Sequence, residues 1–353
     1  MFFDPDLMDP FPWFFLFWPS GRRKTRGAGA ASGSGTMVAA LLLRQRGCTR
    51  CLSATGSGRG LARRDTPFCW RPCPRTARAH AGLAARAAHG QSGQSVDVYW
   101  LSLCKVGMEA AKLVGERHLG VEDWENARAA RDEGTRLQRL VSSAMRRRVL
   151  ARYSGGGSGK TLAFGREEGG KPFLVDGAGY IHFNVTHTPT LVGVCVGIGG
   201  PVGIDSENGR RELRGSVGKI AKRWFSAQEL AALEACEDEA AARRRFYRLW
   251  TLKEAFLKAT GMGISSSVSL RGCAFDFVDG GVGPGREPST DIRFEILGGG
   301  SDGLRGEDWG FATIEPVRGD FLSVCWKRGD REGVTVRTHR CDIDEDTGEF
   351  LFS

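Results

Sequence analysis

The chain has 353 residues, of which 41% are hydrophobic and 26% are charged, a composition typical of globular proteins with one large or two modest domains. The net charge of +9 comes from residues 1–95, which contain 14 Lys and Arg against 4 Asp and Glu, whereas the remainder has 36 basic and 37 acidic residues. A nucleic-acid-binding domain needs a basic surface of its own. The near-neutral charge of residues 96–353 therefore argues against a nucleic-acid partner.

Residues 1–95 are predicted to be a targeting leader or a disordered extension. Residues 21–95 are rich in Arg, Gly, Ala and Ser and contain a single acidic residue, Asp65, as is typical of organelle transit peptides. The acidic start of the chain does not suit a presequence, and Met37 is a more conventional first residue. The composition leaves two interpretations open: import into a mitochondrion or plastid, or an extension without targeting information on a cytosolic protein.

The cysteines do not predict a disulfide framework. Six of the ten are scattered without paired spacing, which favours a reducing compartment. Cys48, Cys51, Cys69 and Cys73 have spacings compatible with zinc, but Gly, Ser, Arg and Pro surround them, so incidental cysteines are the favoured interpretation. The aromatic run 11–18 is too short to span a bilayer, and no membrane partner is expected.

Hydrophobic periodicity predicts ordered structure from about residue 96. The expected helices are 124–153, 217–234 and 240–260, the last closed by Gly261. The expected strands are 96–103, 161–164, 180–185, 191–198, 202–205, 273–278, 292–296, 311–314 and 321–326. Hairpins outnumber strand–helix–strand units, which favours an α+β fold. A long helix followed by a short strand occurs twice and indicates an internal duplication.

Two carboxylates stand at the end of the predicted strand 202–205. Asp205 and Glu207 are two residues apart, so an extended backbone turns both side chains to the same side. Two like charges at this distance repel unless a cation lies between them, and Mg²⁺ prefers oxygen ligands. The pair alone is also compatible with a solvated strand end.

A third carboxylate lies on the predicted helix 240–260. Trp250, Glu254 and Lys258 share one face at intervals of four residues, beside an apolar stripe. Glu254 could complete an octahedral Mg²⁺ site together with phosphate oxygens and water. The simpler alternative is a surface ion pair between Glu254 and Lys258.

Two further segments could meet an anion. Thr186 and His187 come at the end of a predicted strand, where they offer a hydroxyl and an imidazole, although a lone His is more often structural. Lys171 lies in the turn 169–172 as a point charge suited to phosphate.

Taken in order, these segments resemble the Sfp-type 4'-phosphopantetheinyl transferases, the superfamily of holo-acyl-carrier-protein synthases. The resemblance covers about residues 96–330, and Thr186 stands where the family has Ser, keeping a hydroxyl. The matching motifs are Gly170-Lys171-Pro172, Phe183 to His187, Gly203 to Glu207, Arg223 to Glu229, and Phe246 to Lys258 with Gly261 and Gly263.

The resemblance implies Mg²⁺-dependent transfer of 4'-phosphopantetheine from coenzyme A to a serine of an apo acyl or peptidyl carrier protein, with release of adenosine 3',5'-bisphosphate. It implies that Asp205, Glu207 and Glu254 bind the metal, that Glu254 is the general base and that Lys258 stabilises charge on the phosphate. Lys171, Thr186 and His187 would hold the coenzyme. The alternatives are a catalytically silent protein that binds coenzyme A or carriers, and a different Mg²⁺-dependent phosphate enzyme.

The implied fold is two similar α+β subdomains, about 96–200 and 201–330, related by pseudo-twofold symmetry with the active site at their interface, within a monomer. Residues 331–353 are expected to be a C-terminal tail. The sequence does not select the carrier proteins, nor the arginines that contact the coenzyme phosphates; the candidates are Arg128, Arg131, Arg136 and Arg139.

Overall fold

The computed structural model describes residues 94–157, 159–167, 170–177, 180–213, 215–261, 270–278, 288–297, 304–329 and 333–353. The leader with its cysteines, Met37, Gly169 and Gly263 lie outside these ranges. None of the helices in the described ranges is long and apolar enough to cross a membrane.

The first half of the described chain begins with a strand and three helices and ends with two pairs of strands. One predicted helix is in fact two, α4 and α5, because Asp132 accepts a hydrogen bond from the backbone of Thr135 and starts a new helix there. The elements are β1 (Gln94–Ser102), α3 (Met108–His118), α4 (Val121–Arg128), α5 (Glu133–Tyr153), β2 (Phe164–Arg166), β3 (Pro172–Leu174), β4 (Ile181–His187) and β5 (Leu191–Ile198).

The second half has the same order of elements. Here also a predicted single helix is two, α6 and α7, because Ser226 and Glu229 form a capping box that begins α7. Asp238 caps α8 through the backbone of Ala241, and Gly261 ends it with a φ of 71°. The elements are β6 (Val202–Asn208), α6 (Val217–Trp224), α7 (Ala227–Glu234), α8 (Glu239–Thr260), β7 (Cys273–Phe277), β8 (Ile292–Ile296), β9 (Trp309–Val317) and β10 (Asp320–Lys327).

The two halves also share their strand order. β1, β5 and β4 are neighbours in one sheet, and β6, β10 and β9 are neighbours in the other, so the first strand of each half pairs with its last. A short antiparallel hairpin, β2–β3 or β7–β8, follows the long helix in each half. The predicted α+β class is confirmed.

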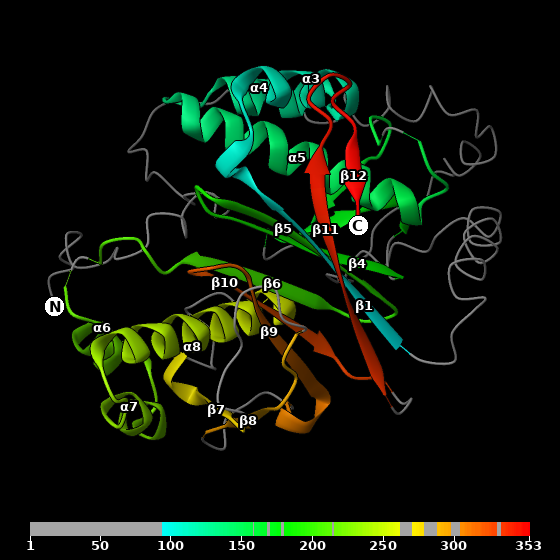
Figure 1. Cartoon of the computed structure of the whole chain (residues 1–353). Helices are drawn as coiled ribbons and strands as arrows, with labels where there is room; N and C mark the ends of the chain where they lie inside the picture. Colours follow the sequence, from blue (N-terminus) through cyan, green and yellow to red (C-terminus); the bar gives the residue numbers. More distant parts are fainter. Residues whose placement is uncertain are drawn as a thin grey trace, which may run out of the picture.

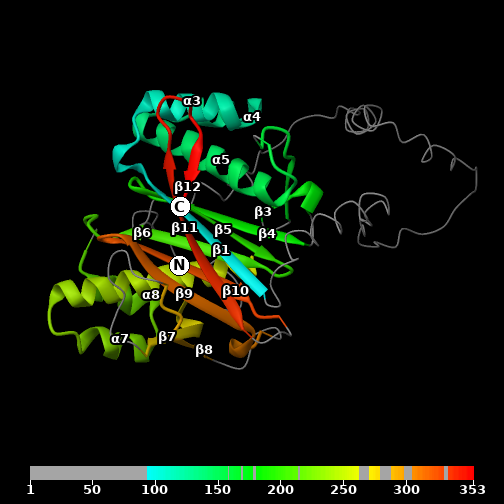
Figure 2. The same ribbon diagram turned by 45° about the vertical axis from the view of Figure 1, so that its right-hand side comes forward.

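The elements stack as helix, sheet, sheet, helix (Figures 1 and 2). Helix α5 covers the outer face of the first sheet, with α3 and α4 packed against it. Helix α8 covers the outer face of the second sheet, with α6 and α7 packed against it. The sheets meet through a shared core whose buried side chains come from both, among them Val98, Cys195, Ile204 and Val324. Alternate residues of β1 face opposite ways, since Tyr99 and Leu101 join the core under α5.

Two C-terminal strands complete the first sheet. β11 (Val334–Ile343) pairs in parallel with β1, from Gln94 opposite Val334 to Trp100 opposite Arg340, and β12 (Phe350–Phe352) pairs with β11. The segment predicted to be a tail therefore forms two strands of the five-stranded sheet.

Asp97 fastens β1 to β11. Its carboxylate accepts hydrogen bonds from Arg337 at 2.7 and 2.9 Å and lies 3.0 Å from His339 Nε2. Burial opposes ionisation of this group, but the hydrogen bonds from His339 and Arg337 outweigh it and hold the pKa of Asp97 well below its usual range. The ionised carboxylate thus stabilises the parallel pair.

We expect Asp97→Asn to lower the free energy of unfolding at pH 7 by about 1–3 kcal/mol. A carboxyl whose folded pKa is depressed stabilises the fold above its unfolded pKa and loses that contribution as the pH falls. The wild-type protein should therefore lose stability below about pH 5 more steeply than Asp97→Asn does. Denaturant unfolding at pH 3.5 to 7 measures this, with the exposed Glu109→Gln as control. Parallel pH profiles for wild type and Asp97→Asn would contradict it.

Candidate active site

A close approach of strand to helix builds the site. β6 lies directly on α8, because Gly203 has no side chain: a Cβ there would lie 2.1 Å from the carbonyl oxygen of Ala255 and 2.4 Å from the nitrogen of Ala259. Only glycine fits at this contact. The arrangement sets Asp205, two residues along β6, against Lys258 of α8, whose Nζ is 2.6 Å from Asp205 Oδ1.

The three predicted metal ligands form one electrostatic group. Asp205, Glu207 and Glu254 are all buried, with exposed fractions of 7%, 9% and 3%. Burial, and after it the charge of Asp205, raises the pKa of Glu207 to about 8. Burial and the charges of Asp205 and Glu207 likewise raise the pKa of Glu254 well above its usual value, with Lys258 opposing them. The charge of Arg211 opposes the shift at Glu207, and Lys258 opposes it throughout, yet neither cancels it. The three carboxylates therefore still carry more negative charge than the nearby cations neutralise.

The donor atoms suit a hard cation. Asp205 Oδ2 and Glu254 Oε1 are buried and have no hydrogen-bond partner among the described residues. Such oxygens are costly unless a cation or donor meets them, and Mg²⁺ takes oxygen ligands. In the described ranges, no three His, Cys, Asp or Glu side chains are already arranged as a ligand set for a metal ion. Lys258 is bonded to the other oxygen of Asp205, and its ammonium also donates to the carbonyl of Ile204 at 3.2 Å.

Strand β4 joins the two sheets beside the carboxylates. Asn184 Oδ1 accepts a hydrogen bond from the backbone nitrogen of Ile204 at 3.1 Å. Thr186 Oγ1 accepts one from the nitrogen of Ser206 at 3.0 Å and also bonds the Ser206 hydroxyl. Ile204 and Ser206, whose backbone nitrogens donate these bonds, lie on either side of Asp205 in β6. Thr186, predicted to hold the coenzyme, is only 4% exposed, and its hydroxyl fixes the strand that carries the carboxylates.

His187, the last residue of β4, lies within the electrostatic reach of Lys258 and Arg139. Burial, and then the charge of Lys258, lowers the pKa of His187 to about 4, so its imidazole is neutral at pH 7. Of the four candidate arginines, Arg139 is the one whose charge acts on His187. Its guanidinium also donates to the carbonyl of Asn126 at 2.8 Å, which holds α5 against the end of α4.

Lys171 joins three segments. Its ammonium donates to the carbonyl of Val202 at 3.0 Å and to that of Ala259 at 3.1 Å, linking the turn before β3 to β6 and to the last turn of α8. A cation is favourable at a helix C-terminus. Burial lowers the pKa of Lys171. The ammonium that the sequence analysis assigned to a phosphate is thus engaged by two backbone carbonyls.

Lys253, the residue before Glu254 in α8, belongs to a buried ion pair that was not predicted. Lys253 Nζ is 2.9 Å from Glu229 Oε2, and both side chains are fully buried. The same ammonium donates to the carbonyls of Leu270 and Cys273, each at 2.6 Å. Glu229 in turn accepts from the backbone nitrogens of Ser226 and Phe275. The pair fixes α7 and β7 to the helix that carries Glu254.

A second cross-link was also not predicted. Asp320, at the start of β10, accepts a hydrogen bond of 2.6 Å from Thr190 of the β4–β5 turn and one of 3.1 Å from Arg210. Asn208, the last residue of β6, donates to Thr190 at 3.0 Å. The network joins the two halves next to Glu207. Its members are distant in sequence and carry no motif.

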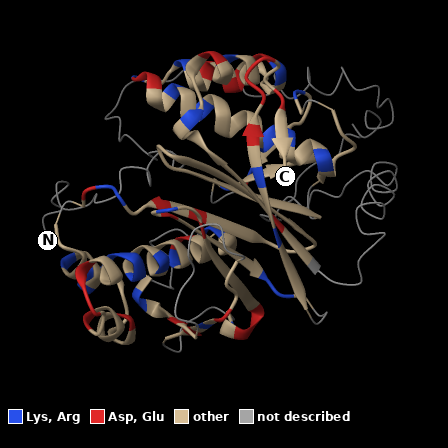
Figure 3. Ribbon diagram, in the orientation of Figure 1, with Lys and Arg blue, Asp and Glu red and all other residues tan. Residues whose placement is uncertain are grey.

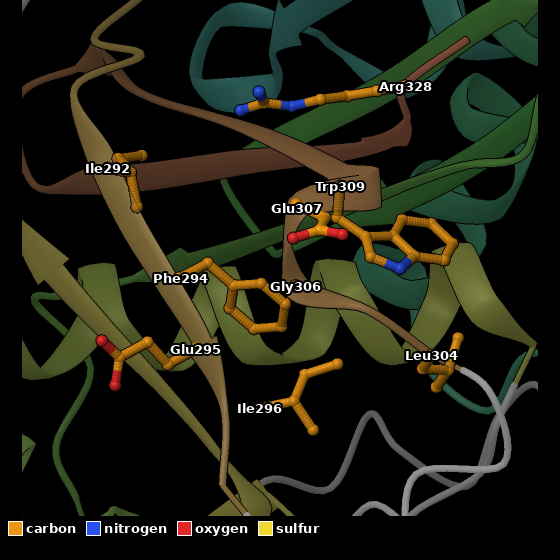
Figure 4. A pocket seen from close by; sticks show the side chains of 9 residues that line it. All are labelled: Ile292, Phe294, Glu295, Ile296, Leu304, Gly306, Glu307, Trp309 and Arg328. Atoms are coloured by element: carbon orange, nitrogen blue, oxygen red, sulfur yellow. The ribbon is translucent and has the colours of Figure 1, made fainter. Parts of the chain in front are cut away.

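A cavity lies apart from these residues. It has a volume of about 540 Å³ and lies beside β8 and β9, with Phe294, Ile296 and Trp309 among its walls (Figure 4). None of the predicted site residues lines it.

Comparison with known proteins places this site in a family. A family model described as the 4'-phosphopantetheinyl transferase superfamily matches residues 201–306, which run from β6 through α8 to β8 and include all three carboxylates. The chain is 36% identical over 104 residues to 4'-phosphopantetheinyl transferase Sfp of Bacillus subtilis, covering 30% of this chain and 43% of that protein.

Two further similar proteins are also named 4'-phosphopantetheinyl transferases. The chain is 36% identical over 121 residues to 4'-phosphopantetheinyl transferase HetI of Nostoc sp., covering 34% of this chain and 49% of the relative. It is 33% identical over 140 residues to 4'-phosphopantetheinyl transferase pptA of Paxillus involutus, covering 35% and 52%. The chain thus spans about half or less of these relatives. Its C-terminal region belongs to the 4'-phosphopantetheinyl transferase superfamily of the Sfp type, as the ordered motifs predicted.

Proposed function

We propose that the protein transfers 4'-phosphopantetheine from coenzyme A to a serine of an apo acyl or peptidyl carrier protein and releases adenosine 3',5'-bisphosphate. The observation that carries the proposal is the buried group of Asp205, Glu207 and Glu254. Its negative charge exceeds that of the cations beside it, and it lies in the segment that matches the transferase family. A catalytically silent relative that only binds coenzyme A or carriers would gain nothing from keeping three costly buried carboxylates beside Lys258.

Asp205, Glu207 and Glu254 would hold Mg²⁺. The bound ion would neutralise the coenzyme's pyrophosphate and act as a Lewis acid. Without a cation, burial and mutual repulsion oppose the ionised forms of these carboxyls, as the raised pKa values of Glu207 and Glu254 indicate. A bound Mg²⁺ would supply the positive charge that these three carboxylates need in order to stay ionised.

Glu254 is the proposed general base. The serine oxygen forms a bond to the phosphorus that carries the pantetheine, while the bond from that phosphorus to the bridging oxygen breaks. The serine proton passes to Glu254, and the electron pair of the broken bond leaves with adenosine 3',5'-bisphosphate. A carboxylate with a raised pKa accepts a proton more readily than an ordinary one. Lys258 would stabilise the charge that develops on the transferred phosphate.

His187 and Arg139 are proposed to face the coenzyme phosphates, since the charge of Arg139 acts on His187 and His187 is close enough to sense Lys258. We propose Lys171 and Thr186 for the wall of the coenzyme site, where their hydrogen bonds to β6 and α8 position the carboxylates. Each hydrogen bond of this kind contributes about 1 kcal/mol.

We further propose that residues 96–330 are two subdomains related by pseudo-twofold symmetry, with the site at their interface in a monomer. The shared order of elements and of strands supports this relation, as do the hydrogen bonds from β4 to β6. Compartment is a separate proposal, cytosol or an organelle; fluorescent fusions of residues 1–95 and of the chain from Met37 test it.

The transfer is tested by incubating the full chain with coenzyme A, Mg²⁺ and a panel of apo carrier proteins, followed by intact-mass measurement. The expected result is a mass gain of one phosphopantetheine on the carrier, abolished by chelation of Mg²⁺. Carrier binding without any mass gain across the panel would indicate the silent relative. Hydrolysis of coenzyme A in the absence of a carrier would instead indicate a pyrophosphatase.

A further inference from the structure

Three buried hydroxyls form a chain from α8 into the second sheet. Thr251 of α8 and Ser323 of β10 are joined by a hydrogen bond of 2.7 Å, and Ser323 donates to Thr313 of β9 at 3.2 Å. The chain ends at two backbone carbonyls, that of Arg248 at 3.1 Å from Thr251 and that of Leu322 at 3.4 Å from Thr313. All three hydroxyl residues are buried. Each hydroxyl therefore has its partners within the protein, as buried polar groups require.

The chain continues the row of side chains that contains Asp205. Ser323 is paired with Asp205 across β10 and β6, and with Thr313 across β10 and β9. Residues paired in this way point to the same face of a sheet, with their Cβ atoms about 4.5–5.5 Å apart. That face is turned to α8, because Asp205 contacts Lys258 and Ser323 contacts Thr251. Figure 3 shows the end of β6 in red beside α8.

The bond between Thr251 and Ser323 lies next to two of the proposed metal ligands. Thr251 is three residues before Glu254, so their side chains are neighbours on the surface of α8. Ser323 is the neighbour of Asp205 in the sheet. The bond therefore connects the turn of helix before Glu254 to the strand beside Asp205. On the other side of Glu254, the close contact at Gly203 fastens the last turns of α8 to β6.

The packing of α8 on the second sheet does not by itself require hydroxyls. On the same face of β10, the residues on either side of Ser323 are Phe321 and Cys325, which belong to the apolar core under α8. Apolar contacts are non-directional, whereas a hydrogen bond restricts both a distance and an angle. Buried polar groups that have all their partners make a core more rigid. The hydroxyl chain therefore restricts how far α8 can shift over β10.

We propose that Thr251 and Ser323 are positioning residues of the metal site, and that their hydrogen bond selects Mg²⁺ over a larger divalent cation such as Ca²⁺. This inference rests on the metal site of the proposed function. Mg²⁺ demands a near-octahedral set of oxygens at about 2.0–2.1 Å, whereas Ca²⁺ takes oxygens at about 2.3–2.6 Å in flexible geometries. By keeping α8 close to the sheet, the bond opposes the wider spacing of Asp205 and Glu254 that Ca²⁺ needs.

The test compares two cations and does not depend on turnover. Thermal unfolding of the full chain over a series of Mg²⁺ concentrations, and separately of Ca²⁺ concentrations, gives two apparent affinities for each variant in the absence of coenzyme A and carrier. Thr251→Val and Ser323→Ala remove the bond, and Thr251→Ser keeps it. Thr313→Val is the matched control, since it makes the same change at a buried hydroxyl of the same chain, one strand further from Asp205 than Ser323 is.

We expect Thr251→Val and Ser323→Ala to lower the ratio of Mg²⁺ affinity to Ca²⁺ affinity at least about fivefold, and Thr251→Ser and Thr313→Val to stay within about twofold of wild type. Without cations, Thr251→Val and Thr313→Val should lower the Tm by similar amounts, since each removes a buried hydroxyl and leaves its partner short of a bond.

A lower Tm with an unchanged affinity ratio in both Thr251→Val and Ser323→Ala would mean that the chain only stabilises the fold, and would overturn the proposal. Wild type that binds neither cation would contradict the proposed metal site and this inference together. The mass assay on carriers decides the transfer separately, since the cation titrations need no turnover.

Discussion

Replacing Glu254 by Gln is expected to abolish transfer, with a loss of at least about 10³-fold, while leaving the protein folded. Without Mg²⁺ at pH 7.5, we also expect the variant to be more stable than wild type by roughly 1–3 kcal/mol. The carboxyl of Glu254 must either stay charged beside Asp205 and Glu207 or take up a proton, and Gln needs to do neither. The pKa of Glu254 is higher in the folded protein than in the unfolded one, so this carboxyl destabilises the fold at any pH above its unfolded pKa. The stability advantage of Glu254→Gln should therefore shrink as the pH falls toward 4.5.

Thermal unfolding with and without Mg²⁺, beside the mass assay, checks this expectation. Mg²⁺ should raise the Tm of wild type and have a much smaller effect on Glu254→Gln and on Asp205→Asn. Glu239→Gln, an exposed change in the first turn of the same helix, is the control and should behave as wild type. Near-normal turnover in either site variant, or a full response to Mg²⁺, would mean that the metal site is assigned wrongly.

Replacing Lys253 by Met is expected to destabilise the protein by about 3–5 kcal/mol. The change leaves Glu229 as an uncompensated charge where both partners are fully buried, and it also removes the donor to the carbonyls of Leu270 and Cys273. A loss of this size is a large fraction of the stability of a typical domain. Activity should fall because Glu254 is the next residue of α8.

Denaturant unfolding measures the loss, with the exposed Lys105→Met as control. The double variant Glu229→Gln with Lys253→Met should recover part of it, because no unpaired charge remains. If Lys253→Met costs less than about 1 kcal/mol, the ion pair does not hold α7 and β7 to α8.

The sequence predicted those parts of the site that short spacings define. Asp205 and Glu207 are paired by the two-residue repeat of a strand, and Glu254 and Lys258 by the turn of a helix. It did not predict the hydrogen bonds that side chains of the first half make to the second half. Examples are the bonds from Lys171 and Thr186 to the backbone of β6. Those contacts depend on how closely the strands approach one another, which no local pattern encodes.

The fold shows the same limit. The α+β class followed from the order of elements, but the breaks before α5 and α7 depend on single capping residues, Asp132 and Ser226. A periodic apolar stripe continued across both breaks and predicted longer helices. Cross-links such as Asp320 with Thr190 were also not predicted, since 130 residues separate the partners.

The parallel pairing of β1 with β11 has a consequence for synthesis. Asp97 and Arg337 are 240 residues apart. During synthesis, β1 therefore cannot pair with β11 until β11 has left the ribosome. Until then β1 has one unpaired edge, which is where strands of other chains add and aggregates begin. Every proposed catalytic group lies upstream of the last twenty residues. Loss of those residues would therefore reduce the yield of native protein far more than it would reduce the activity of each molecule that does fold.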